Sequence, residues 1–197
     1  MGARTSAKVA GRIDIGDLVR AAMNLERRTM QLYCRFEVLF PTPAAVKSFW
    51  LDMAEHESRH VGALALVAGL LECDSQRQMP MVPPAAAVHV ARLERLIERA
   101  ERAADESLPL REAFAFALDI ESSEVEGLVL DLLQLLRGTR ERERAAMSLI
   151  HDLSDLSLMI ERYGGDPALL QRADRVVERE LKRHGATVHR AIAAHRR

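Results

Sequence analysis

Four long stretches of the chain carry apolar residues at the three- and four-residue spacing of an amphipathic helix. They cover about residues 15–40, 44–73, 110–136 and 140–163. Proline or glycine follows each of them, and these residues typically end or separate helices. Because no segment shows the sustained two-residue alternation of a half-buried strand, we predict an all-α fold.

The lengths of the connections indicate how these helices are arranged. Short links join the first helix to the second and the third to the fourth, which predicts two antiparallel hairpins. About residues 74–108 form a long crossover that contains a shorter helix near 86–104. We therefore predict a four-helix bundle over residues 15–163, with its one long crossover between the second and third helices. A C-terminal helical extension over 166–197 follows, broken near Gly185.

Composition and cysteine usage exclude several classes of protein. The 28 basic and 29 acidic residues give a formal net charge of −1, which argues against a general nucleic-acid binder. No apolar run reaches the length of a membrane span, and the first dozen residues lack the apolar core of a secretory signal, so we expect a cytoplasmic protein. Cys34 and Cys73 form no C-x-x-C pair, which excludes a zinc ribbon or a rubredoxin-type iron site. We expect both cysteines to be buried as small apolar residues.

Acidic and histidine side chains interrupt the apolar faces of all four predicted bundle helices. They are Glu26 in the first helix, Glu57 and His60 in the second, Glu121 followed by Glu124 in the third, and His151 in the fourth. A buried carboxylate without a partner is very unfavourable, so several inward carboxylates need shared cations. A pair of divalent metal ions bound by carboxylates and imidazoles meets this need.

Each of these residues also has a simpler interpretation when it is considered alone. A single Glu-x-x-His occurs by chance in a chain this rich in acids, Glu26 fits the exposed edge of its helix, and His151 fits a hydrogen-bonded core histidine. The arrangement favours a common site: Glu26 precedes His60 by 34 residues, and Glu121 precedes His151 by 30. This quasi-twofold repeat is expected when two hairpins build one site.

The segments 22–33, 53–61 and 117–124 resemble the corresponding parts of a rubrerythrin-like ferritin domain. The resemblance implies iron ligands at Glu26, Glu57, His60 and Glu121, with Glu124 as a further ligand. It also places Tyr33 beside the metal cluster. The expected cofactor is two non-haem iron ions, with manganese or zinc as alternatives at either position.

The fourth helix departs from the family pattern. The family repeats Glu-x-x-His there, whereas this chain has Ser148 three residues before His151. A serine cannot replace a bridging carboxylate, although an inward Glu124 would keep four carboxylates for two divalent ions. Asp152 and Asp155 are possible substitutes if the helix shifts. The site is therefore open to three interpretations: an asymmetric pair, a single metal, or a vestigial site.

The resemblance implies an oxidoreductase that reduces hydrogen peroxide or oxygen. Because rubredoxin-type cysteines are missing, electrons would come from a separate donor protein, and we expect a homodimer that binds neither nucleic acid nor membrane. Two alternatives stay open. One is a ferritin-like bundle with a degenerate or single-metal site that serves as an interaction or structural module, and the other is an iron-binding or ferroxidase protein.

Overall fold

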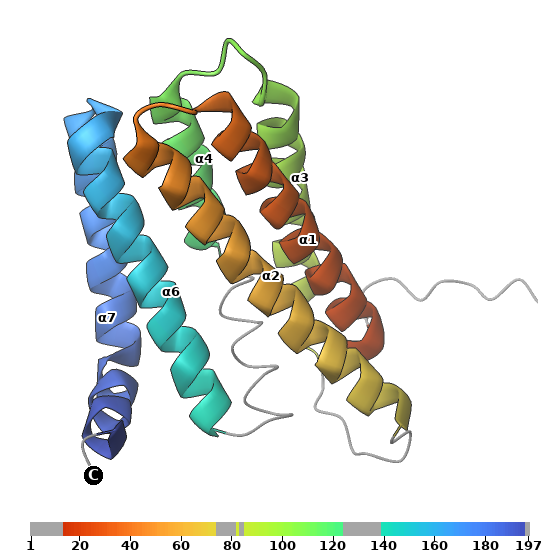
Figure 1. Ribbon diagram of the computed structural model, residues 1–197. Helices are drawn as coiled ribbons and strands as arrows, with labels where there is room; N and C mark the ends of the chain where they lie inside the picture. The colour runs from red at the N-terminus through yellow and green to blue at the C-terminus, as the bar shows by residue number, and fades with distance from the viewer. Residues whose placement is uncertain (1–13, 74–81, 83–84, 124–138, 196–197) are drawn as a thin grey trace, which may run out of the picture.

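The computed structural model describes residues 14–73, 82, 85–123 and 139–195, and every regular element within them is a helix (Figure 1). These elements are α1 (Ile15–Leu39), α2 (Ala44–Cys73), α3 (Ala86–Ala103), α4 (Leu110–Glu121), α6 (Thr139–Met159), a π-helical turn η1 (Ile160–Gly164) and α7 (Pro167–His195). The all-α prediction is confirmed. Most of the predicted helix ends agree within a residue. The third helix is an exception, because α4 ends at Glu121 and not at 136: Ser122 and Ser123 are outside the helix, and residues 124–136 lie outside the described part of the chain.

The helices pack as neighbours along the chain and across it. α1 and α2 form a hairpin through the short link at 40–43, and α3 lies against α1 on the side away from α6 (Figure 1). α6 contacts both α2 and α4, so α1, α2, α4 and α6 surround a common interior. Arg28 on α1 joins this group to α3 through a two-point ion pair with Glu101, at 2.7 and 3.0 Å.

An aromatic cluster fills one end of this interior. Trp50 on α2 is fully buried and contacts Tyr33 and Phe36 of α1 as well as Phe114 of α4, with ring centres 4.9 to 5.8 Å apart. Burial of a large aromatic ring removes more apolar surface from water than any other single side chain. The cluster therefore fixes the spacing of three helices at the level where the acidic side chains begin.

After α6, the predicted helix end at Gly164-Gly165 is confirmed, whereas the predicted break at Gly185 is not. Gly165 ends the helical segment with φ +62°, a conformation that glycine adopts without steric cost, as predicted from the Gly164-Gly165 pair. α7 then packs along α6. The predicted break near Gly185 is wrong, because α7 continues through this residue to His195. A single glycine costs a helix only about 1 kcal/mol relative to alanine, which good helix formers on both sides offset.

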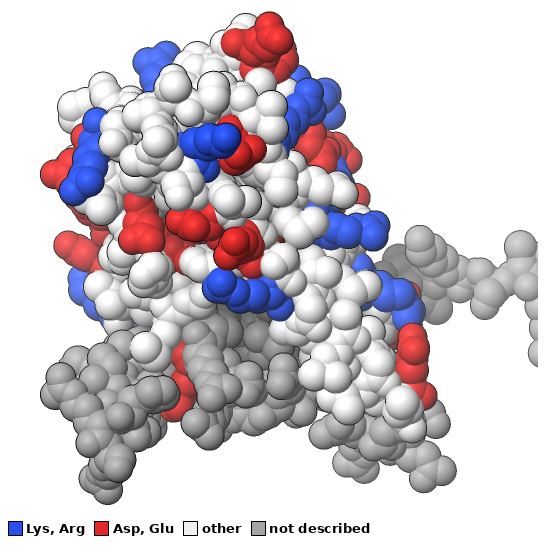
Figure 2. Space-filling model, viewed as in Figure 1, with Lys and Arg blue, Asp and Glu red and all other residues white. Residues whose placement is uncertain are grey.

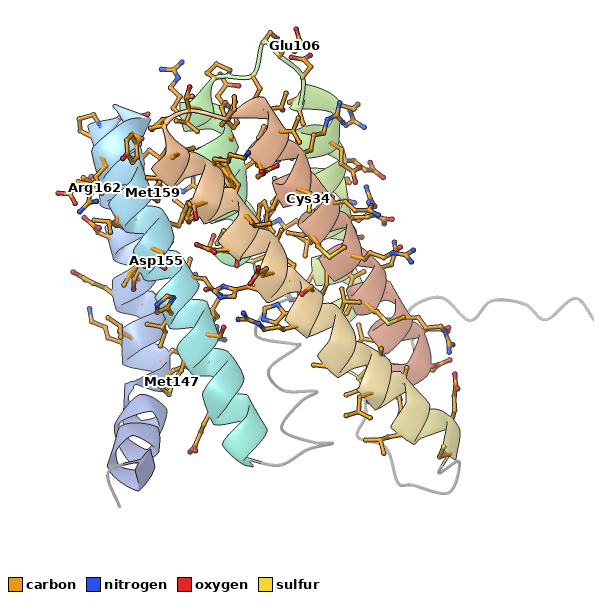
Figure 3. All side chains as sticks on the ribbon, viewed as in Figure 1. Cys34, Glu106, Met147, Asp155, Met159 and Arg162 are labelled. Atoms are coloured by element: carbon orange, nitrogen blue, oxygen red, sulfur yellow. The ribbon has the colours of Figure 1, made fainter. Side chains whose placement is uncertain are left out.

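The two cysteines also differ from the prediction. Cys34 and Cys73 are both exposed free thiols rather than buried apolar residues, and Figure 3 places Cys34 on the outside of α1. The buried stripe of α1 passes through Tyr33 and Phe36, which leaves Cys34 on the opposite face. Among the described helices, none has the length and apolar character needed to cross a membrane.

Candidate metal centre

Three glutamates from three helices point into the interior. Glu26 on α1, Glu57 on α2 and Glu121 on α4 are only 3%, 2% and 3% exposed. Their inward orientation was predicted from their positions on the apolar stripes, and the structure confirms it. The helical register explains it, since Glu26 lies between Ala22 and Thr29, which are buried on the same face of α1.

Glu26, Glu57 and His60 converge on one point. His60 Nδ1 lies 3.3 Å from Glu26 Oε2 and 3.5 Å from Glu57 Oε2, so each residue offers one ligand atom, all within 4.8 Å of one another. Two carboxylate oxygens of this cluster, Glu26 Oε1 and Glu57 Oε2, are buried and accept no hydrogen bond of good geometry. Buried polar atoms are normally satisfied, so these oxygens indicate a place for a cation.

Burial and mutual contacts shift the pKa values of the groups in this cluster. Burial raises the pKa of Glu57 well above its usual value, and the adjacent Glu26 raises it further. Burial alone would lower the pKa of His60, but its contacts with Glu26 and Glu57 outweigh burial and raise the pKa well above its usual value. Both shifts favour the protonated forms of Glu57 and His60 in the metal-free cluster, and a divalent cation would compete with such protons.

Glu121 adjoins this cluster from the opposite helix. The Tyr33 hydroxyl donates a 2.7 Å hydrogen bond to Glu121 Oε1, a pairing that joins α1 to α4 inside the protein. Burial raises the pKa of Glu121, and this hydrogen bond partly offsets the rise. Tyr33 therefore lies beside the acidic cluster, as the sequence resemblance implied, and holds one carboxylate oxygen in a fixed position.

A fourth buried carboxyl group comes from α6. Asp152 is 2% exposed, and its Oδ1 contacts Nδ1 of His56 on α2. Burial and the charge of Glu121 raise the pKa of Asp152 to about 8, whereas burial and the neighbouring Arg59 lower the pKa of His56. Both shifts favour the uncharged forms of the two groups.

The predicted inward position of His151 is wrong. Its side chain is 68% exposed, on the same face of α6 as the exposed Met147 and Leu158 (Met147 is labelled in Figure 3). The inward stripe of α6 instead contains Leu149, Leu153 and Leu156, and Asp152 falls on it. One residue along a helix turns the side chain by about 100°, which explains why Asp152 is buried and His151 is not.

The sequence pattern therefore did not reveal the importance of Asp152 and His56. The sequence predicts Asp152 only as a substitute that requires a helix shift, and its pattern does not single out His56. The spacing of Asp152 from Leu149 and Leu156 could have identified it as an inward residue. Glu124, predicted as a further ligand, lies outside the described residues.

The surroundings of the centre differ on its two sides. The aromatic cluster around Trp50 closes one side and excludes water. On the other side, Figure 2 shows acidic side chains gathered over the middle of α2 and α6, where Asp52 and Glu55 are exposed and Asp155 is partly exposed. This acidic surface favours the approach of cations.

No family model, curated protein or solved structure matches this chain. The function is therefore argued from the geometry of the centre.

Proposed function

We propose that the protein binds divalent transition-metal ions, iron in the first place, between α1, α2, α4 and α6, in the manner of a rubrerythrin-like ferritin bundle. In this proposal α3 belongs to the long crossover between the second and third bundle helices. The observation that carries the proposal is the convergence of Glu26, Glu57 and His60 within 4.8 Å, with buried oxygens that lack hydrogen-bond donors.

The donor set and the charge fit a pair of such ions. Carboxylates together with imidazole suit iron, manganese and zinc better than magnesium or calcium. The four buried carboxyl groups of Glu26, Glu57, Glu121 and Asp152 would balance the four positive charges of two divalent ions. Asp152 of α6 would contribute its charge from beside Glu121 without acting as a ligand of this pair, and Ser148 cannot act as a bridging ligand.

Bound iron would supply the electrons for the reduction of hydrogen peroxide or oxygen. The protein itself would contribute position and environment. Tyr33 holds Glu121 by its hydrogen bond, and the ring of Trp50 behind it keeps water from that side of the centre. Electrons would come from a separate donor protein, and we propose a homodimer in the cytoplasm.

A second candidate is a bundle that binds a single ion, or none, and acts as an interaction or structural module. The outward orientation of His151 favours it, because the fourth helix then contributes no imidazole to the buried cluster. An iron-binding or ferroxidase role remains the third candidate, and a large shell of subunits would identify it.

Elemental analysis of protein purified from iron-rich medium tests the metal proposal, and an absorption spectrum after air oxidation tests the redox proposal. We expect iron near two ions per chain and near-ultraviolet bands of oxidised iron. Glu57→Ala should abolish loading while the protein stays helical, whereas Glu55→Ala, which removes an exposed neighbour, should leave loading unchanged. Iron retained in Glu57→Ala would contradict the site.

Two further measurements separate the candidates. Ser148→Glu should raise the occupancy if a missing carboxylate limits it. Protein that contains no transition metal after growth in iron-rich medium would support the structural module. The native mass measured by light scattering distinguishes a dimer from a storage shell.

A further inference from the structure

A second group of metal-ligating side chains lies where α2 meets α6, nearer the surface than the Glu26–Glu57–His60 cluster. His56 of α2 contacts Asp152 of α6, and His151 Nδ1 lies 3.8 Å from Asp152 Oδ1. The two imidazole rings are 6.4 Å apart between centres and inclined at 72°. Two helices thus bring two imidazoles to either side of one buried carboxyl group.

The contact between His56 and Asp152 does not satisfy these groups as an ordinary structural pair would. Both His56 Nδ1 and Asp152 Oδ1 are buried, and neither makes a hydrogen bond of good geometry. Asp152 is almost completely removed from solvent and faces the histidine from the opposite helix. A buried carboxyl group without a hydrogen bond needs another partner, and a cation is the partner that two adjacent imidazoles also favour.

We propose that His56, Asp152 and His151 form a separate binding site for a divalent transition-metal cation such as Zn²⁺, Co²⁺ or Fe²⁺. Metal–nitrogen bonds are about 2.1 Å long, so the centres of two imidazoles on one ion lie roughly 5 to 6 Å apart. The two rings are 6.4 Å apart between centres, so the exposed His151 side chain has to move toward His56 for both to bind one ion. Binding would fasten α2 to α6, which have few other contacts in the described part of the chain.

Asp155 fits the role of a positioning residue for this site. Its Oδ2 lies 3.3 Å from His151 Nδ1, one helical turn further along α6. A ligating histidine commonly gives its other ring nitrogen to a carboxylate, which fixes the orientation of the ring. With Asp155 at Nδ1, the Nε2 atom of His151 is left for the ion.

The location also gives the ion access from solvent. His151 is largely exposed, and the surrounding surface carries the exposed acids Asp52 and Glu55 and the partly exposed Asp155 (Figure 2). A cation attracted to this surface meets His151 and His56 before it meets the buried glutamates. The site uses none of Glu26, Glu57 and His60, so it can be tested apart from the redox proposal, and an ion bound here would lie on the way to the buried cluster.

Co²⁺ binding to the metal-free, full-length protein tests the proposal. The bound Co²⁺ is counted by equilibrium dialysis, and its visible absorption reports the ligand geometry. In a Glu57→Gln background, which disables the buried cluster, we expect one Co²⁺ per chain. Adding His56→Gln or Asp152→Asn should remove this ion, and adding His151→Gln should weaken its binding at least about tenfold.

Matched controls remove the same chemical groups elsewhere. His89→Gln on α3 and Glu72→Gln near the C-terminal end of α2 should keep the Co²⁺ and its spectrum. Circular dichroism establishes that each variant is folded, and the use of two different ligand variants guards against the loss of either one to misfolding. Co²⁺ retained at full affinity in both His56→Gln and Asp152→Asn would overturn the proposal, as would complete loss of Co²⁺ in Glu57→Gln alone. Loss of Co²⁺ in Glu57→Gln alone would mean that the two groups of side chains form one site. Retention of Co²⁺ in His56→Gln and Asp152→Asn would exclude the second site and leave the proposal for the buried cluster unaffected.

Discussion

Replacement of Asp152 by asparagine should stabilise the metal-free protein, and the gain should grow with pH. Its pKa rises from 3.8 to about 8 on folding, because α2, α4 and α6 bury the carboxyl group and Glu121 lies near it. The folded state thus binds this proton more tightly than the unfolded state. Stability from this group is fully present below about pH 3.8 and is lost as the pH rises to about 8.

The size of the effect follows from that shift in pKa. At 1.36 kcal/mol for each factor of ten, the loss between the two limits is at most about 6 kcal/mol, of which about 4 kcal/mol falls between pH 5 and pH 9. Solvent that reaches a newly ionised group reduces this figure, so we expect at least about 2 kcal/mol. Asparagine cannot ionise, has nearly the same shape, and can donate a hydrogen bond to His56.

The assay is urea unfolding followed by far-ultraviolet circular dichroism, in excess chelator, at pH 5, 7 and 9. The quantity of interest is the difference in unfolding free energy between Asp152→Asn and the unsubstituted protein, which cancels pH effects common to both. The other charged groups facing Asp152 are His56, His60 and Arg59 of α2, and His151 and Asp155 of α6, and all of them remain in both proteins. Asp52→Asn, an exposed change on α2, is the control and should show a small and flat difference. A flat difference for Asp152→Asn, or a variant less stable than the unsubstituted protein at pH 9, would refute the reasoning.

Two further substitutions test the interior around the centre. Tyr33→Phe removes the hydrogen bond to Glu121 and leaves a buried carboxyl oxygen without its donor, so the metal-free protein should lose about 1 to 3 kcal/mol in urea unfolding; an unchanged midpoint would contradict the importance of this bond. Trp50→Ala leaves a cavity among Tyr33, Phe36 and Phe114, and should cost about 3 to 5 kcal/mol, measured by thermal or urea unfolding, unless the three rings collapse into the space.

The helices of this protein could be predicted from its sequence because their ends are marked by local chemistry. Pro41 and Pro43 separate α1 from α2, and Gly165 ends the segment after α6, each through its own backbone preference. Gly185 misled the prediction, since a lone glycine lowers helix stability without preventing a helix. Packing of α7 on α6 and good helix formers on both sides of the glycine then determine whether the helix continues through it.

The candidate site was predictable only where the apolar stripe of a helix is unambiguous. Glu26, Glu57 and Glu121 each continue the three- and four-residue spacing of the buried apolar residues of their helix, so their inward orientation followed from helical spacing. α6 offers two competing stripes, one through Met147 and His151 and the other through Leu149 and Asp152. Contact with α2 and α4 selects the second stripe, and no local signal in the sequence contains that information.

The proposed function depends on a cation bound by Glu26, Glu57 and His60. Anomalous diffraction from crystals of the iron-loaded protein, recorded on both sides of the iron absorption edge, tests this claim most directly. We predict an anomalous peak within bonding distance of one carboxylate oxygen from each glutamate and of one nitrogen of His60. A map with no peak between these side chains, in a crystal in which they remain buried and hydrogen-bonded to one another, would contradict the account.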